Sequence, residues 1–536
     1  MNSLVLVLAS IVIFVIAYVT YGRWLAKEWG VDPSRETPAH YMEDGVDYVP
    51  AKAPVLLGHH FASIAGAGPI VGPIAAASFG WIPVMLWIVI GGIFFGGVHD
   101  FGALFSSIRN DGKSVGQVIE ANIGRTEKRL FAVFSWLALV LVIAAFVNIV
   151  ANTFVASPEA AMASMLFIAL AIGFGFLVYR KGASLAVGSV IGVGLLVVCI
   201  WLGMSFPLVL SKTTWIFFLL VYIFIASVTP VWILLQPRDY LNSFLLYAMI
   251  IGAVLGLIFY APSMQLTPFA GFNVGGNYLF PMLFITIACG AISGFHSLVG
   301  SGTTSKQISN EKDAMLIGYG GMLIECVLAV IALITAGYIS GGKLAELSGA
   351  GGPINVFSEG IGTFMTKIGI PFSVGKPFAA LAISAFALTS LDTATRLGRF
   401  ILQEFFEDDT KEVQSVIVTN RFVATTITVA AGGALALVGW TKVWPLFGSS
   451  NQLLAGLALL ALAAYLKNQG KKIGMIVAPM IFMFAATLSA IALLIQANLA
   501  AGNMLLVGFA IALFILAIVL VARSYKVLTG NGKIKE

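Results

Sequence analysis

The segment GHHFASIAGAGPIVGP, residues 58–73, places adjacent histidines and a Gly/Pro-rich break inside an apolar stretch. It has a second copy, since residues 61–68 read FASIAGAG and residues 295–302 read FHSLVGSG. Glycine frees the backbone and proline removes an amide donor, so we predict that both copies are helices interrupted within a membrane. Broken helices in two corresponding halves of a chain are typical of a transporter site.

The composition excludes an ordinary soluble domain. Apolar residues make up 59% of the 536 residues and charged residues 10%, against about a quarter charged in typical soluble proteins. The run Leu4–Tyr21 lacks a basic start and a small-residue cleavage site, so we interpret it as a retained span rather than a signal peptide. The three cysteines have no disulfide or zinc-type spacing. We therefore predict an all-α, polytopic membrane protein with one transmembrane domain over residues 1–536 and no cofactor.

Apolar runs of about 20 residues predict about fifteen transmembrane helices. The predicted spans are residues 4–21, 55–80, 82–108, 130–154, 161–179, 184–209, 214–236, 240–261, 280–305, 313–339, 374–395, 418–440, 443–466, 472–496 and 503–522. The second broken copy lies seven spans after the first, so it crosses the membrane in the opposite direction. This arrangement predicts inverted repeats that begin near residues 55 and 280.

The basic residues divide unequally between the two predicted faces. The face with the N-terminus holds 5 of the 30 lysines and arginines, and the other face holds 25. The positive-inside rule then places the N-terminus outside and the C-terminal tail in the cytoplasm of a plasma-membrane protein. The net charge of +6 reflects this topology, so we expect no nucleic-acid partner. We predict an outside loop at Gly341–Ile370 and an amphipathic surface helix at Phe400–Glu412.

Three of the five histidines flank the predicted breaks, with His59 and His60 ahead of the first and His296 ahead of the second. Imidazoles can donate, accept or take up a proton near neutral pH, as a proton-coupled carrier requires. Alternatively, they hydrogen-bond across helices and stabilise the breaks. A zinc site that adds His99 and Asp100 is a weaker alternative because no spacing demands it, and we expect no metal.

Two carboxylates lie inside predicted spans. Asp100 follows His99 in the third span, and Glu325 lies twelve residues into the tenth span, about 18 Å along a helix and hence near the midplane. Gly318 and Gly321 share the helix face of Glu325, which predicts close packing against a neighbouring helix. These groups are candidates for ion coupling. A protonated Glu325 in a static hydrogen bond is the alternative.

The segment TSLDTATRLGR offers hydroxyls at Thr389 and Ser390 that suit a sodium site, although such hydroxyls also bond their own helix. Asp392 has Arg396 one turn later as its predicted partner. Asn451 and Gln452 either line a pathway or pack helices together. Residues 236–239, Gln-Pro-Arg-Asp, close the seventh predicted span, and we interpret their charges as an ion pair at the membrane interface.

Six motifs resemble the carbon-starvation protein A family of bacterial and archaeal membrane proteins, which is implicated in uptake of peptides and, in some members, pyruvate. They are GHHFASIAGAGPIVGP, GGVHDFGALFSSIR, PVWILLQPRDYLNS, ACGAISGFHSLVGSGTTSKQ, TSLDTATRLGR and WPLFGSSNQLLAGLAL. The resemblance implies a secondary transporter with a LeuT-like fold of the amino acid, polyamine and organocation superfamily. In that fold two five-helix inverted repeats begin with broken helices, and Thr389 and Ser390 would take the usual sodium position. Seven helices rather than five separate the breaks here, so two would be insertions.

We therefore predict a symporter, not an enzyme, that imports short peptides, with pyruvate or another small carboxylate as the alternative substrate and a channel as the rival class. Protons are the expected coupling ion, and sodium is the alternative. The oligomeric state stays open. Helix N-terminal amides would hold the substrate carboxylate. The predicted substrate site comprises His59, His60, Gly66, Ala67, Gly68, Pro69, His296, Gly300, Ser301, Gly302 and Thr303, and the predicted ion-coupling group comprises Glu325, His99, Asp100, Thr389 and Ser390.

Overall fold

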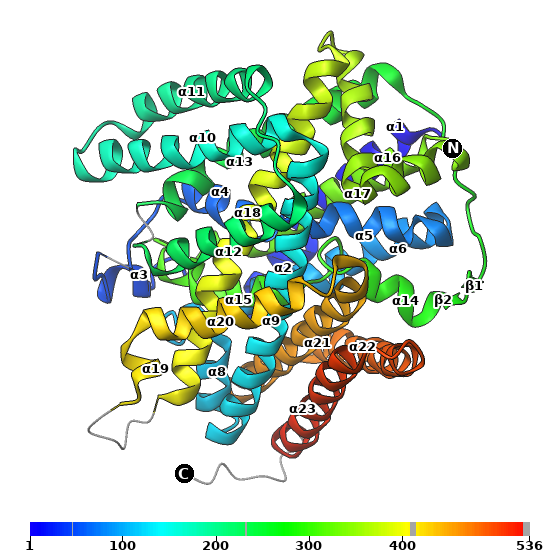
Figure 1. The fold of residues 1–536 in the computed structure, drawn as a ribbon. Coiled ribbons are helices and arrows are strands. Elements are labelled where there is room, and N and C mark those ends of the chain that lie inside the picture. The colour runs from blue at the N-terminus through cyan, green and yellow to red at the C-terminus, as the bar shows by residue number, and fades with distance from the viewer. Residues whose placement is uncertain (46, 231–232, 408–413, 529–536) are drawn as a thin grey trace.

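The computed structural model is an assembly of closely packed helices (Figure 1) and describes residues 1–45, 47–230, 233–407 and 414–528. Within these residues eleven helices are long and apolar enough to cross a membrane, and a bent helix pair makes up to twelve. The first half of the chain contains α1 Ser3–Ala17, α2 Arg23–Trp29, α3 Pro38–Tyr41, α4 Ala53–Ile64, α5 Gly68–Ala76, α6 Trp81–Gly91, α7 Gly97–Ile108, α8 Val115–Asn122, α9 Arg125–Ala156, α10 Pro158–Gly175, α11 Leu185–Ser205, α12 Lys212–Val228 and α13 Leu235–Tyr260.

The second half begins with a two-stranded hairpin and returns to helices. Its elements are β1 Asn273–Val274, β2 Asn277–Tyr278, α14 Leu279–Thr286, α15 Gly294–Gly302, α16 Gly321–Gly337, α17 Gly341–Thr366, α18 Phe372–Phe406, α19 Val416–Thr419, α20 Arg421–Ala436, α21 Trp440–Asn468, α22 Gly474–Ala500 and α23 Met504–Leu528. Short π-helical turns continue α1 into α2 and α6 into α7, so each of these pairs forms one span.

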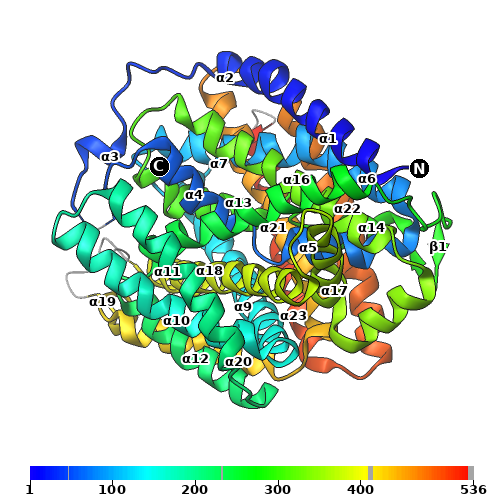
Figure 2. The ribbon, with the colours of Figure 1, turned by 90° about the horizontal axis from the view of Figure 1, so that it is seen from above.

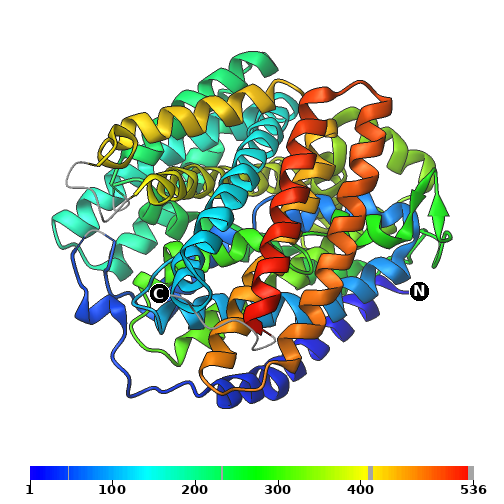
Figure 3. The same cartoon turned by 90° about the horizontal axis from the view of Figure 1, so that it is seen from below.

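Burial separates interior helices from peripheral ones. The α16 and α21 spans are almost fully enclosed, whereas α11 exposes most of its apolar residues, including Val190 at 76%. A helix that is apolar all round and exposed on most of its surface suits contact with lipid tails. The pair α10 and α11 projects from one side (Figure 1), and α1 with α2 lies along another edge (Figure 2). The helices α9, α22 and α23 run side by side (Figure 3).

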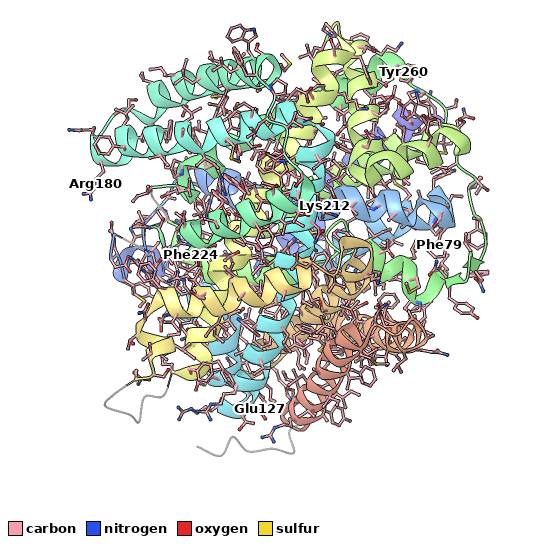
Figure 4. All side chains as sticks on the ribbon, in the orientation of Figure 1. Phe79, Glu127, Arg180, Lys212, Phe224 and Tyr260 are labelled. Carbon is pink, nitrogen blue, oxygen red and sulfur yellow. The ribbon has the colours of Figure 1, made fainter. Side chains whose placement is uncertain are left out.

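Figure 4 locates the ends of these outer helices. Arg180 lies at the outer end of the α10–α11 pair, and Glu127 lies at the start of α9. Arg523 near the end of α23 donates a hydrogen bond of 2.5 Å from Nε to a carboxylate oxygen of Glu127. This ion pair joins the last helix of the chain to α9.

The prediction of fifteen spans is matched only in part. The helices α12 and α20 have 17 and 16 residues, fewer than the roughly 20 that a perpendicular span needs. The predicted span 280–305 is divided into α14 and α15. A count of fifteen therefore stays a prediction, whereas the all-helical, multi-pass architecture is confirmed.

Two surface predictions differ from the structure. The segment predicted as an outside loop, Gly341–Ile370, is mostly the helix α17, which is kinked at Gly352 with φ 71°. Its glycines suggested a loop, but Val356 and Phe357 bury against the neighbouring helices, and this burial stabilises the helix. The first part of the predicted surface helix Phe400–Glu412 is the end of α18, which continues to Phe406, and residues 408–413 lie outside the described residues.

Candidate functional site

The first break lies where the sequence places it. α4 ends at Ile64, α5 begins at Gly68, and the two helices differ in direction by 45°. Gly66 and Ala67 lie between them, and Pro69 is in the first turn of α5, where its missing amide hydrogen costs no helical hydrogen bond. Space also demands glycine here, because a Cβ on Gly66 would lie 2.5 Å from the hydroxyl of Ser390.

The second break was predicted at the wrong residues. Gly300, Ser301 and Gly302 belong to the uninterrupted helix α15, and Thr303 is its C-terminal cap. The chain leaves α14 after Thr286 and re-enters a helix at Gly294, so the break is residues 287–293. His296 therefore follows its break, whereas His59 and His60 precede theirs. The two copies share residue types, but these residues do not occupy equivalent positions relative to the two breaks.

The two breaks pack directly against each other. A Cβ built on Gly68 would lie 2.5 Å from Cys289 Sγ, and one built on Gly72 would lie 2.7 Å from the carbonyl oxygen of Thr286. The glycines of the first broken helix therefore permit close approach to the second break. Segments more than 200 residues apart in sequence form one central site.

Side chains from two other helices satisfy the backbone at the breaks. Ser390 of α18 donates a hydrogen bond of 2.9 Å to the carbonyl oxygen of Ser63, at the end of α4. Asn451 of α21 accepts a bond of 2.8 Å from the amide of Phe295, at the start of α15, and Gln452 donates to the carbonyl oxygen of Ile287 at 3.2 Å. Unpaired backbone groups are costly away from water, so these contacts stabilise both interruptions.

A buried cluster of acidic and histidine side chains lies beside the second break. Asp100 of α7 contacts His99 Nδ1 at 2.7 Å and His296 Nδ1 at 2.7 Å through its two oxygens. His296 Nε2 lies 3.5 Å from Glu325 Oε2 on α16. All of these side chains are at most 1% exposed. His296 therefore connects two carboxylates. We name His99, Asp100, His296 and Glu325 together the His296 cluster.

Close packing holds Glu325 in this position. A Cβ on Gly318 would lie 2.8 Å from Phe101 Cα on α7, and one on Gly321 would lie 3.6 Å from His60 Cδ2. The predicted packing of this helix face against neighbours is confirmed. Cys289 Sγ, His296 Nε2 and a Glu325 oxygen lie within 4.8 Å of one another, which is compact enough to surround one ion. Within this group His296 Nε2 and Glu325 Oε2 lie 3.5 Å apart.

The adjacent histidines of α4 face different partners. His60 Nδ1 contacts the hydroxyl of Thr304 at 2.8 Å, just beyond α15. His59 Nδ1 lies 3.3 Å from Asp239 Oδ2 on α13. His59 and His60 thus join the first broken helix to two separate polar regions, and His99 belongs with Asp100 rather than with this pair.

The second polar region centres on Arg238, and its importance was missed by the sequence analysis. Arg238 is 2% exposed and contacts Tyr222, Asp239 and Asp392, and its Nη2 lies 3.3 Å from Thr389 Oγ1. It is therefore buried, not interfacial as predicted. Asp392 pairs with Arg238 rather than with the predicted Arg396.

Helix geometry explains why the nearer arginine is not the partner. Arg396 donates to the carbonyl oxygens of Ala226 and Thr229 at the end of α12, so it satisfies another helix terminus. The hydroxyl of Thr389 donates a hydrogen bond of 3.0 Å to Asp239 and accepts one from Arg238. Ser390 is occupied with Ser63. Of the two hydroxyls proposed for sodium, that of Thr389 thus lies beside the Arg238 guanidinium.

The sequence matches the family described as carbon starvation protein CstA over residues 2–351 and 343–490. The chain belongs to this family. The peptide transporter CstA of Escherichia coli K12 is 35% identical to it, over 87% of this chain and 77% of that protein. The peptide transporter CstA of Bacillus subtilis 168 is 34% identical, over 86% and 84% respectively. The pyruvate/proton symporter BtsT of Escherichia coli K12 is 34% identical, over 85% and 76%.

The fold also has a likeness among solved structures. A crystal structure of the Eremococcus coleocola manganese transporter matches with a TM-score of 0.56 at 13% sequence identity, over 91% of this chain and 99% of that chain. This likeness concerns the fold alone. Together with the family, it makes the chain a multi-pass membrane protein of a transporter family that acts on small molecules, as the six motifs predicted.

Proposed function

We propose that this protein is a proton-coupled symporter that imports short peptides across the plasma membrane, by alternating access in a LeuT-like core. The observation that carries the proposal is the position of His296, between Asp100 and Glu325 beside the second break. The peptide transporters at 34 and 35% identity support the substrate class. The pyruvate/proton symporter at 34% identity supports small carboxylates as the second candidate.

The His296 cluster has the geometry of a proton switch. Both His99 and His296 present Nδ1 to Asp100, so an ionised Asp100 receives a hydrogen bond from each. His296 Nε2 is then left for Glu325. At 3.5 Å neither His296 Nε2 nor Glu325 Oε2 has a hydrogen-bond partner among the described residues. On closer approach a neutral His296 would accept a hydrogen bond from a protonated Glu325, and a charged His296 would donate one to the carboxylate. One proton therefore moves between the two residues along a single contact.

Charge counting connects this proton to transport. With Asp100 ionised and one proton shared by His296 and Glu325, the cluster carries a net charge of −1. A second proton neutralises it, because His296 is then positive and Glu325 neutral. An uncompensated charge away from water is costly. The core would therefore change conformation more readily when loaded with the second proton, which couples proton entry to substrate entry.

The Arg238 network favours protons over sodium as the coupling ion. Arg238 Nη2 lies 3.3 Å from Thr389 Oγ1, where a sodium ion would need hydroxyl oxygens. Two like charges so close would repel strongly in a poorly hydrated interior. A sodium site at Thr389 and Ser390 would thus require Arg238 to move.

The test is uptake of labelled dipeptides and of pyruvate into proteoliposomes, with proton and sodium gradients imposed separately. A symporter that moves one proton per substrate should accumulate substrate about tenfold for each unit of pH difference. Saturation of uptake with substrate separates a carrier from a channel. Equal accumulation with a sodium gradient alone would contradict the proposal.

The variant Glu325→Gln examines the proton site itself. Glutamine can still form a hydrogen bond with His296 but cannot carry a proton, so we expect exchange of substrate to persist and gradient-driven accumulation to disappear. The control is Glu127→Gln, which alters a carboxylate paired with Arg523 at the periphery. Full accumulation by the Glu325→Gln variant would show that the coupling proton travels elsewhere.

A further inference from the structure

A cavity with a volume of about 540 Å³ lies apart from the His296 cluster, among the end of α9, the start of α12, the kink of α17 and the start of α18. Its lining includes Asn152, Lys212, Ser358 and Lys376. Val71 of the first broken helix also lines it, so the cavity reaches the neighbourhood of the first break. We name this cavity the vestibule. Lys212 marks its position in Figure 4.

Three features make the vestibule suitable for an anion. The described residues that line it include two lysines, Lys212 and Lys376, and no aspartate or glutamate. Lys376 pairs with Glu359 at 2.8 Å, but Lys343 also lies 3.5 Å from Glu359, so this carboxylate has two cationic partners. The region therefore retains an excess of positive charge.

The kink of α17 supplies the second feature. Gly352 has φ 71°, and a new helical segment of α17 starts at Pro353 and runs to Thr366. Gly352, Pro353 and Asn355 all line the vestibule. A helix N-terminus presents free amide hydrogens and a partial positive charge, which bind carboxylates well.

Ser358 is the third and independent feature. It is 3% exposed, it lines the vestibule, and its Oγ has no hydrogen-bond partner among the described residues. A buried hydroxyl without a partner is costly, and an arriving carboxylate oxygen would accept its hydrogen bond.

One face of α9 leads from the vestibule to the first break. Ile149, Thr153 and Ala156 line the cavity at helical spacing, and Phe146 lies one turn deeper. A Cβ on Gly66 would lie 2.8 Å from the Phe146 ring, which also packs edge-on against Phe447 at a centroid distance of 6.0 Å. Phe146 therefore lies between the vestibule and the break.

We infer that the vestibule is the first binding site for the free carboxylate of the substrate, which Lys212, Ser358 and the helix start at Pro353 hold before Phe146 moves aside. The inference rests on the proposed function, and it specifies the substrate class. A dipeptide would bind through its C-terminal carboxylate, and pyruvate would bind through its single carboxylate. A C-terminally amidated dipeptide would bind poorly.

The first experiment compares uptake kinetics of wild type and Lys212→Gln in proteoliposomes. Loss of one charged contact to a carboxylate should raise KM about tenfold and leave the maximal rate nearly unchanged. The preference for a dipeptide over its C-terminal amide, measured by competition, should fall by a similar factor. The control is Lys442→Gln, an exposed lysine on the same predicted face but outside the cavity lining.

The second experiment measures binding without transport. Asn152→Cys is treated with a membrane-impermeant thiol reagent, with and without dipeptide or pyruvate, against the parent chain as the background. Substrate should slow the labelling, and Lys212→Gln should remove this protection. Unchanged KM in Lys212→Gln together with unprotected labelling would overturn the vestibule site. Protected labelling without any uptake by wild type would instead overturn the proposed function.

Discussion

Replacement of Asn451 by alanine is the sharpest test of how the second break is held. Asn451 Oδ1 accepts a hydrogen bond of 2.8 Å from the amide of Phe295, and its Nδ2 donates one of 3.0 Å to Ser293 Oγ. Ser293, the N-cap residue of α15, does not cap this helix with its own side chain. Asn451 therefore acts as a helix cap supplied by another helix, and His296 lies in the first turn that it caps.

The structure sets the expected magnitude for Asn451→Ala. Deletion leaves the buried amide of Phe295 without a partner, which costs about 1–3 kcal/mol, in the range measured for lost helix caps. The cost falls on the start of α15, so His296 should lose its fixed position between Asp100 and Glu325. We expect a thermal midpoint lower by a few degrees in detergent and a much larger loss of proton-driven uptake.

The assay combines a thermal unfolding scan in detergent with uptake into proteoliposomes. The control is Asn498→Ala on α22, because that side chain donates a hydrogen bond within its own helix and accepts one from Asn503 in the following loop. It should change neither measurement. A wild-type midpoint and wild-type uptake in Asn451→Ala would refute the reasoning, since the cap would then contribute nothing to the position of His296.

Two further predictions rest on close contacts and burial, and a third rests on the distribution of basic residues. Gly68→Ala should abolish transport, because its Cβ would overlap a cysteine at 2.5 Å, whereas Gly300→Ala, with its nearest neighbour at 3.9 Å, should retain uptake within about twofold. Arg238→Gln should destabilise the protein by about 3–5 kcal/mol, seen as loss of folded protein in detergent, because two buried carboxylates lose their cation. A cysteine placed at Ser157 should react with an impermeant reagent in intact cells and one at Asp111 should not; the opposite result would invert the topology.

Local chemistry made the first break predictable from sequence. Gly66 and Pro69 remove helical restraints within a few residues of each other, and the structure interrupts the helix between Ile64 and Gly68. The burial of Glu325 could also be predicted from the sequence, because a carboxylate in the middle of an apolar span needs a buried partner. Its position opposite His296 bears out its burial, and its role in coupling stays a prediction.

The remaining features depend on contacts between distant segments. The second break lies at residues 287–293, ahead of the glycines that resemble the first copy, since glycine in α15 serves helix packing: a Cβ on Gly302 would lie 2.6 Å from Leu397. Arg238 and Asp392 are 154 residues apart, and no spacing rule joins them. Arg238 looked interfacial because it follows a proline near a predicted span end, whereas the fold buries the start of α13, where Arg238 and Asp239 are at most 2% exposed.

The polar contacts divide the core into two groups of helices, and we propose that these groups move relative to each other during transport. Ser390 ties α18 to α4, and Arg238 ties α13 to α18 through Asp392. Asn451 ties α21 to α15, and His296 ties α15 to α7 through Asp100. Between the two groups the polar side-chain contacts are fewer: His60 meets Thr304, and the other close contacts are apolar approaches, such as Gly302 of α15 against Leu397 of α18. A movement that opens the site to one side can separate the groups there without exposing a buried ion pair, because each ion pair lies within one group. The His296 cluster would then change its access to water as a unit, which is the condition for loading a proton on one side and releasing it on the other.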